Sequence, residues 1–387
     1  MRKNKIIFAS NRIPTRETSG GASQLFILMD ILSNDDVSLI YLLSKKEKTL
    51  SEIELQRIDF LKETIPNLIF RIRIKNNYFD INFKKLSENE IFYKSKNQKL
   101  FVFDDEEIKF YSKINIKKTA WPDDPIWLLH LSKAKCNLLD PVSRLINFLN
   151  FIKKYLIFIF SFKKHLSKYN KIIHQASHHS NYFKKHFFDK VSFAPPIFYE
   201  LKSFTPPSTK NIEKIKLLHI GHLGGAATLA GLDLLINNNL IYLSKINFKN
   251  FEVNVVGKLN IPVKTINKIK NEKVNFIGFA DDLDLEIKNS DALIVPSDHS
   301  VGTRTRILDP ISFGVPIVAH KATLKGMPYL TKFPNVFIYS NSKELHESLL
   351  FLKEYLSKPQ PDIKNLFNSI FTKKGLAKEW FNTIKNA

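Results

Sequence analysis

Short apolar runs alternate with longer segments of helical periodicity along nearly the whole chain. In the first half, apolar runs predict strands at residues 5–10, 37–42, 67–73 and 172–177, and strands that end at 119–125 and 135–140. In the second half, they predict strands at residues 215–221, 251–257, 274–278, 291–295, 316–319 and 336–339. Helical patterns lie between them. This alternation is typical of βα units and therefore of parallel sheets.

A proline-rich segment at residues 194–208 divides the chain. The 387 residues exceed what one core usually holds, so two domains are expected. We predict an α/β protein with two Rossmann-like domains, at residues 1–200 and 201–365, that face each other across a ligand-binding cleft. A C-terminal helix at residues 366–387 could cross back to the first domain. Residues 76–117 show no clear pattern.

After Arg144 the chain has only two arginines, Arg304 and Arg306, although lysine is abundant. They follow the predicted strand at 291–295 and begin a predicted helix at 304–313. Guanidinium groups suit bidentate contact with phosphate oxygens. The start of a helix beyond the carboxyl end of a parallel strand also favours an anion. The pattern therefore predicts a phosphate site.

The segment around this pair resembles a signature of the retaining, nucleotide-sugar-dependent glycosyltransferases of family four, or glycosyl transferases group 1. The family variant reads Gly-Thr-Arg-x-Lys-x-x-Glu-Ala-x-x-x-Gly-x-Pro-Val-Val. Here Gly302, Thr303, Arg304, Arg306 and Asp309 lead into Gly-Val-Pro-Ile-Val at 314–318. The similarity covers most of residues 215–330 and extends loosely to the first half. It implies the GT-B fold, in which two Rossmann-like domains face each other.

By this resemblance, Arg304 or Arg306 would hold the donor diphosphate. The amides around Gly302 and Thr303 would complete an anion cradle. Asp309 would accept hydrogen bonds from the ribose hydroxyls, or else would be a structural residue of its helix. The acceptor would bind the first domain, and the nucleotide sugar would bind the second.

Further positions complete the implied binding site. Gly20 and Gly21 would bring first-domain amides against the diphosphate or the acceptor, because glycine allows close approach; the alternative is a simple turn into a helix. Phe279 would border the base, and Lys258 could contact phosphate. His222 stands where family members often carry arginine, and it could donate to phosphate; the usual lysine nearby is missing as well.

No catalytic nucleophile stands out, and the retaining family does not clearly need one. For an inverting reaction, Asp124, His130 and Asp140 are candidate bases by position. Asp140 ranks first because it ends the predicted strand at 135–140. The histidines at 174, 178 and 179 resemble a metal or base cluster, but no acidic partner or ligand spacing accompanies them in the sequence, so we interpret them as a satisfied loop or helix-start cluster. We expect no metal, and no cofactor besides the nucleotide sugar as co-substrate.

The net charge of +22 would suit nucleic acid, but lysine outnumbers arginine 50 to 9, a bias that an AT-rich genome would produce. No nucleic-acid-binding motif is present, so no such partner is expected. The single cysteine, Cys136, excludes an internal disulfide, and its neighbours suggest a strand core. We identify no signal peptide and no apolar stretch near the ~20 residues that span a bilayer. A cytoplasmic location is the expectation.

Residues 142–164 combine apolar and aromatic side chains with lysine pairs at 153–154 and 163–164. This composition is compatible with an interfacial helix that touches acidic lipid headgroups, which would make the protein peripheral on the inner face of the membrane. The alternative is a packing helix whose lysines snorkel to solvent.

These expectations form one hypothesis. A bacterial-type cytoplasmic glycosyltransferase moves a sugar from a nucleoside-diphosphate sugar to a glycan or lipid-linked acceptor, in cell-surface polysaccharide or lipopolysaccharide synthesis. Two alternatives stay open. A nucleotide-sugar epimerase of the same architecture would need several acid/base groups, and few are found. A non-catalytic homologue that binds the sugar nucleotide is favoured by the missing family arginine and lysine.

Overall fold

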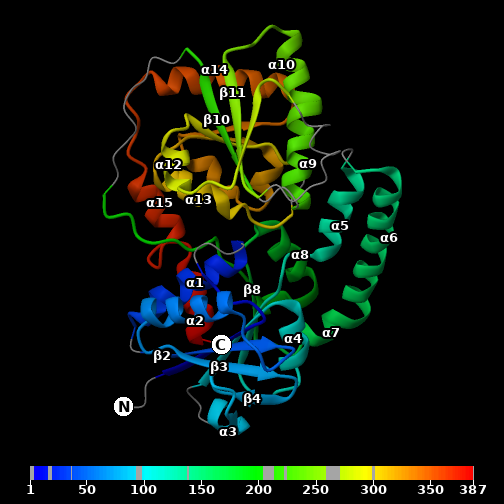
Figure 1. Cartoon of the computed structure of the whole chain (residues 1–387), viewed down its shortest axis with the longest axis vertical. Coiled ribbons are helices and arrows are strands. Elements are labelled where there is room, and N and C mark those ends of the chain that lie inside the picture. The colour runs from blue at the N-terminus through cyan, green and yellow to red at the C-terminus, as the bar shows by residue number, and fades with distance from the viewer. Residues whose placement is uncertain are drawn as a thin grey trace.

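Two α/β domains are stacked along the long axis of the molecule, each built on a mostly parallel sheet (Figure 1). The fold is described from a computed structural model of the chain. It covers residues 4–15, 20–35, 37–92, 98–136, 139–203, 213–221, 225–258, 271–298 and 301–386.

The sheet of the first domain has the strand order β5-β4-β3-β2-β1-β6-β7-β8-β9. Neighbouring strands pair parallel, except for the antiparallel pairs β3–β4 and β4–β5. The strands are β1 Asn4–Ser10, β2 Val37–Lys45, β3 Ile69–Ile74, β4 Asn77–Phe79, β5 Lys85–Leu86, β6 Gln98–Phe103, β7 Lys118–Trp121, β8 Lys171–His174 and β9 Val191–Phe193. The middle residues of β1, Ile6–Ala9, and the last four of β6, Leu100–Phe103, are apolar and buried, because both faces of the sheet are covered.

Two helices of the first domain, α2 and α6, begin at residues whose side chains cap them. The Ser51 side chain and Glu54 form a capping box at the start of α2, and Asp140 caps α6, which has Pro141 in its first turn. A π-helical segment, Phe158–Phe162, joins α6 to α7 without a break. The helices are α1 Gly20–Ser33, α2 Glu52–Thr64, α3 Glu88–Ile91, α4 Asp105–Tyr111, α5 Ile126–Lys135, α6 Pro141–Ile157, α7 Lys163–Leu166 and α8 Ser177–Phe187.

The second domain has a parallel sheet with the order β12-β11-β10-β13-β14-β15. Its strands are β10 Ile215–Ile220, β11 Phe251–Val256, β12 Val274–Gly278, β13 Ala292–Val295, β14 Ile317–His320 and β15 Val336–Tyr339. Its helices include α9 Ala226–Leu234, α10 Ile241–Lys245, α12 Leu283–Lys288, α13 Leu308–Ser312 and α14 Ser342–Leu356. In both sheets the strand order reverses at the first strand, between β1 and β6 and between β10 and β13.

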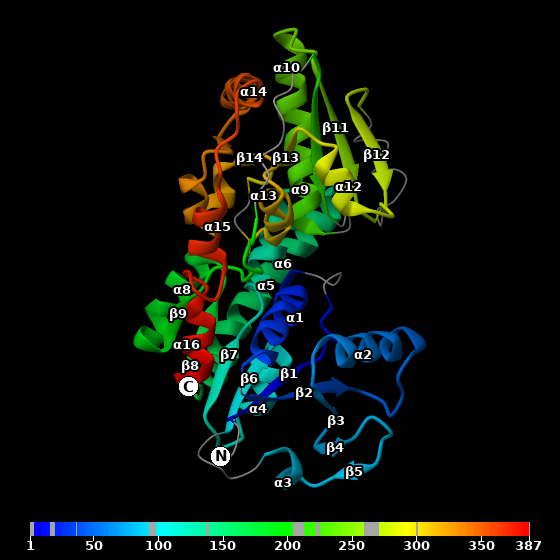
Figure 2. The ribbon, with the colours of Figure 1, turned by 90° about the vertical axis from the view of Figure 1, so that its left-hand side faces the viewer.

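The end of the chain returns to the first domain through α15 Lys364–Phe371 and α16 Lys378–Asn386 (Figure 2). Trp380 of α16 is fully buried, and its Nε1 donates to the carbonyl oxygen of Pro195 at 2.8 Å. Its ring centroid lies 4.4 Å from that of Trp121 at the end of β7. The chain therefore begins and ends in the first domain.

The predicted architecture, two Rossmann-like domains that face each other, is confirmed. The strand predicted to end at 135–140 is wrong. Lys135 ends helix α5, and buried Cys136 packs into the core of the second domain rather than into a strand. Asp140 is the N-cap of the next helix, not a strand end. The described ends of this run, Cys136 and Asp140, are the C-cap of α5 and the N-cap of α6.

Two further findings differ from the sequence expectations. The unplaced residues 76–117 supply β6, a central strand of the first sheet. The helical run Pro141–Leu166 has 26 residues and is, by length and composition, apolar enough to cross a membrane. The expectation that no stretch approaches this length was wrong, because the lysine pair inside the run interrupts the apolar sequence but not the helix.

Candidate functional site

A cavity of about 990 Å³ lies between the domains, at the carboxyl ends of their central strands. Arg12, Asp104, Asp124 and Gln175 line it from the first domain, each in a loop that follows a strand. The loop 303–306 and Asp309 line it from the second domain. Each side is the point where the strand order of the sheet reverses, which is where open α/β sheets bind ligands.

Arg306 reaches across the end of the second sheet. Its guanidinium donates to the carbonyl oxygen of Ile220, the last residue of β10, and to Thr228 Oγ1 at 3.1 Å. A Cβ atom at Gly221 would lie 2.2 Å from Arg306 Nη1, so the side chain needs a residue without Cβ there. Burial and the charge of Arg304 lower the pKa of Arg306 to about 9, so the group stays protonated at neutral pH. Both of these partners are neutral.

Arg304 lies beside Arg306, and it interacts electrostatically with Asp124 of the first domain. Its Nη2 donates to Ser297 Oγ, just after β13, at 3.1 Å. Burial lowers the pKa of Arg304, and the opposing influence comes from the carboxylate of Asp124 in the first domain. Asp124 follows β7, and its side chain is 41% exposed. Arg304 and Arg306 thus both line the cavity, and the carboxylate of Asp124 lies near Arg304.

Gly302 of the second domain lies directly against Asp124 of the first domain. Its φ is +68°, in the left-handed region that favours glycine. A Cβ atom there would lie 1.8 Å from Asp124 Oδ2. The donor-side loop can therefore touch the first domain only with glycine at this position.

Asp124 is held by a histidine of α8. His179 Nδ1 lies 3.2 Å from Asp124 Oδ1, and His179 is almost fully buried. Burial works to raise the pKa of Asp124, but the hydrogen bond and charge of His179, together with Arg304, lower it below its ordinary value. His174, at the end of β8, is buried beside them. Burial and then His179 lower the pKa of His174 to about 3, so it is neutral at pH 7.

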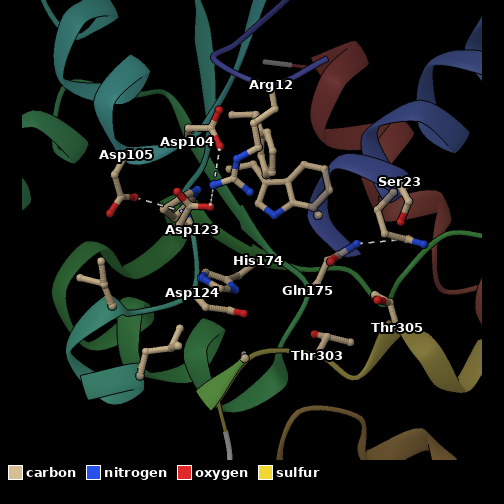
Figure 3. A pocket seen from close by; sticks show the side chains of 18 of the residues that line it. Arg12, Ser23, Asp104, Asp105, Asp123, Asp124, His174, Gln175, Thr303 and Thr305 are labelled. Carbon is tan, nitrogen blue, oxygen red and sulfur yellow. Dashed lines mark hydrogen bonds and ion pairs between the residues drawn. The ribbon is translucent and has the colours of Figure 1, made fainter. Parts of the chain in front are cut away.

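A second group of acids lines the cavity around Arg12 (Figure 3). Arg12 Nη2 lies 3.3 Å from Asp104 Oδ1 and 3.2 Å from Asp123 Oδ1. Asp104 Oδ2 accepts from Ser10 Oγ at 2.7 Å. Burial and the charge of Asp123 raise the pKa of Asp104 to about 6 and that of Asp105 to about 8. This wall therefore contains a carboxyl group that can donate a hydrogen bond at neutral pH.

The structure brings part of the predicted site together. Gly21, Thr303, Arg304, Arg306 and Asp309 line the cavity, and Gly302, the residue before Thr303, lies against Asp124. The buried Oγ1 of Thr303 has no hydrogen-bond partner in the described part of the chain.

Other predicted positions lie elsewhere. Lys258 and Phe279 are not among the described residues that line the cavity, and Phe279 is 82% exposed. Gly20 is the first residue of α1. His222 falls outside the described residues. Asp140 is exposed and accepts from the backbone N–H of Ser143 at 2.9 Å. The expectation that Asp140 ends a strand facing the cleft was therefore wrong, because its carboxylate caps a helix.

Sequence reasoning missed most of the first-domain wall. Asp124 ranked behind Asp140, and the histidine cluster was interpreted as lacking an acidic partner. The structure corrects this, since Asp124 pairs with His179 across 55 positions of sequence. A usable signal was present, because Asp104, Asp124 and His174 all stand at or just after the end of a strand.

Asp124, His174 and His179 are also the residues that could hold a metal ion. One ligand atom from each lies within 4.8 Å of the others. Ligand atoms about 2.1 Å from a tetrahedral zinc ion stand roughly 3.4 Å apart. Asp124 Oδ1 and His179 Nδ1 already lie 3.2 Å from each other. Asp124, His174 and His179 therefore have the side chains either to coordinate a metal ion or to form hydrogen bonds with the hydroxyl groups of a substrate.

Comparisons with known proteins agree with this arrangement. Residues 214–352, which include the arginine loop, match the family of glycosyl transferases group 1. Among curated proteins, none matches the sequence. Solved structures match over nearly the whole chain. The crystal structure of TarM gives a TM-score of 0.69 at 11% identity and covers 99% of both chains.

Two further structures show the same architecture. The lipopolysaccharide outer core galactosyltransferase WaaB gives a TM-score of 0.59 at 12% identity, over 99% of both chains. HepE from Anabaena in complex with UDP gives 0.62 at 12% identity, over 99% of this chain and 100% of that one. The fold is therefore the GT-B fold of glycosyltransferases, as the sequence predicted.

Proposed function

We propose that this protein is a glycosyltransferase that moves a sugar from a nucleoside-diphosphate sugar to a glycan or lipid-linked acceptor in cell-surface glycan synthesis. The observation that carries the proposal is the pair of guanidinium groups, Arg304 and Arg306, in the cavity between the domains. Two adjacent, partly desolvated positive charges fit a diphosphate. The family match over residues 214–352 and the fold shared with HepE bound to UDP support it.

The donor would bind the second-domain side of the cavity. Arg304 and Arg306 would contact the diphosphate, and the unpartnered hydroxyl of Thr303 would donate to it. Asp309 would accept from the ribose hydroxyls. As the glycosidic bond breaks, negative charge grows on the leaving diphosphate. Fixed positive charge at that point lowers the barrier more than it stabilises the bound donor.

The acceptor would bind the first-domain side. Asp124 would accept a hydrogen bond from a sugar hydroxyl, and the protonated carboxyl of Asp105 would donate one. Asp124, on the proposed acceptor side, touches Gly302, which precedes the residues that would bind the donor. An acceptor hydroxyl held there would lie near the diphosphate. The retaining outcome is carried over from the family resemblance, and a cytoplasmic location fits the single, reduced cysteine.

The test is the double substitution Arg304→Ala/Arg306→Ala. We expect nucleotide binding and turnover to fall by roughly 100-fold or more, because the charge that meets the diphosphate is removed. Thermal shift with UDP-, GDP- and ADP-sugars measures binding, since a ligand at 100 times its Kd stabilises by about 2.7 kcal/mol. The matched control is Arg57→Ala, on the exposed face of α2. Turnover should persist in EDTA, because arginines replace a metal.

Other outcomes decide against the proposal. Unchanged nucleotide affinity in the double variant would refute the donor site. A sugar nucleotide converted without any acceptor would assign an epimerase. Tight nucleotide binding without transfer or donor hydrolysis would assign a binding protein.

A further inference from the structure

The helical run Pro141–Leu166, formed by α6, the π-helical segment and α7, leaves one long face uncovered. Of its most apolar window, 11% is buried. Leu145, Leu149, Ile152, Leu156 and Phe160 follow one another at spacings of three or four and are all exposed. Phe160 is 79% exposed. Since apolar stripes of this size are normally covered, the face must have an occupant. We define these five residues as the outer stripe.

The opposite face of the same helix is fixed to the protein. Phe158 and Phe162 are buried in the core of the first domain, and the ring centroid of Phe158 lies 4.5 Å from that of Trp127 on α5. Near its start, Arg144 Nε donates to the carbonyl oxygen of Ala134 at 3.0 Å. The helix is therefore anchored along its length, and it cannot leave the domain to span a bilayer without unpacking this core.

Charge indicates what covers the outer stripe. The segment 141–168 contains six lysines and arginines and no acidic residue. Lys153, Lys164 and Lys168 are exposed beside the stripe. A second copy of this face would bring like charges together, which disfavours self-association. An anionic lipid surface offers both an apolar layer for the stripe and negative headgroups for the lysines.

We propose that the outer stripe and its flanking lysines dock the protein on an anionic membrane, with the helix lying in the plane of the interface. At about 1.5 Å per residue the 26-residue run is roughly 39 Å long, so the buried contact is extended rather than a single anchor. Interfacial helices combine an apolar face with a basic one in this way.

The same helix also forms a wall of the cavity. Lys154, Ile157, Phe158 and Phe162 line it, and Ile157 directly follows Leu156 of the outer stripe. The apolar surface thus continues from the membrane-facing side to the cavity. An acceptor sugar carried on a lipid could reach the donor from the docked membrane without leaving it. This step, unlike the docking, rests on the proposed function.

Co-sedimentation of the full chain with lipid vesicles tests the docking. We expect binding to phosphatidylcholine vesicles that contain phosphatidylglycerol, weaker binding in high salt, and little binding to phosphatidylcholine alone. Leu149→Glu/Leu156→Glu should weaken binding roughly tenfold or more, because two apolar contacts become repulsive charges. Leu350→Glu/Phe351→Glu makes the same change at exposed positions of α14 and should bind like the unmodified protein.

Three results would overturn the proposal: no binding of the unmodified protein to the anionic vesicles, equal binding of the Leu149/Leu156 variant, or a lipid-free dimer in sedimentation equilibrium that this variant disperses. Circular dichroism confirms that each variant folds. Nucleotide binding, measured by thermal shift on the same samples, should be unchanged in the Leu149/Leu156 variant. Vesicle binding without nucleotide binding would thus reject the proposed transferase and leave the docking in place.

Discussion

Gly302 is a position at which the second domain contacts the first. Its left-handed backbone and its missing Cβ let the loop that carries Arg304 touch Asp124. Asp124 is in turn oriented by His179. This contact joins the proposed donor and acceptor sides, beside the hydrogen bond from the Ser177 N–H to the carbonyl oxygen of Gly326 at 3.1 Å.

The variant Gly302→Ala should lose turnover by roughly 100-fold, because a misplaced catalytic group costs about that much. Its free energy of unfolding should fall by about 1–2 kcal/mol from the left-handed backbone. Steady-state kinetics and urea unfolding measure the two effects.

The matched control for this variant is Gly278→Ala. Gly278 also has a positive φ, +84°, but a Cβ atom there would meet nothing within 4 Å. It should show the stability loss and keep full turnover. Equal kinetics in the two variants would show that contact with Asp124 does not matter.

Sequence reasoning reached the arginine pair because arginine is rare in the second half, so its placement carries information. It did not reach the Asp124–His179 pair. Each residue stood out separately, Asp124 as a candidate base and His179 in a histidine cluster, but the two lie on different elements. Their proximity depends on β7 and β8 being neighbours in the sheet, which local patterns do not encode.

Among the helices, α6 depends on its first turn. Asp140 accepts from the backbone N–H of Ser143 and satisfies an amide that the helix leaves free. The sequence suggested a strand here, since a short apolar run has the same appearance in a strand and at the turn of a helical hairpin. The periodic strands of the second domain were easier to predict, because each is bounded by glycine, proline or polar residues.

Replacement of this cap, Asp140→Ala, should lower the free energy of unfolding by roughly 0.5–2 kcal/mol and leave kcat unchanged. Urea unfolding and steady-state kinetics give both values. Ser51→Ala, at the cap of α2, is the comparison and should behave alike. A large loss of kcat at unchanged stability would instead make Asp140 the catalytic base.

The C-terminal helix α16 completes a hydrophobic core of the first domain. Trp380 of α16 packs against Trp121 and Phe101 of the first sheet, although it follows the second domain in sequence. The two-domain division was predictable, since the strand pattern restarts near residue 215. A C-terminal helix crossing back to the first domain was also expected, but its packing against Trp121 and Phe101 was not, because such contacts are non-local.

Truncation of this side chain, Trp380→Ala, should cost about 3–5 kcal/mol, the usual loss for a large buried aromatic. Trp380→Phe should cost less, since it keeps most of the burial and removes the hydrogen bond to Pro195. Thermal and urea unfolding measure both. A loss below about 1 kcal/mol for the alanine variant would show that α16 is not part of the folded core.

The chain crosses between the domains twice, and the two crossings are bound to each other. The side-chain amide of Asn368 in α15 exchanges two hydrogen bonds with the backbone of Leu201, at 2.9 and 3.1 Å. Phe198 N–H donates to the carbonyl oxygen of Phe371 at 2.7 Å. Any movement of one domain relative to the other must therefore carry the segment 198–201 and helix α15 along together.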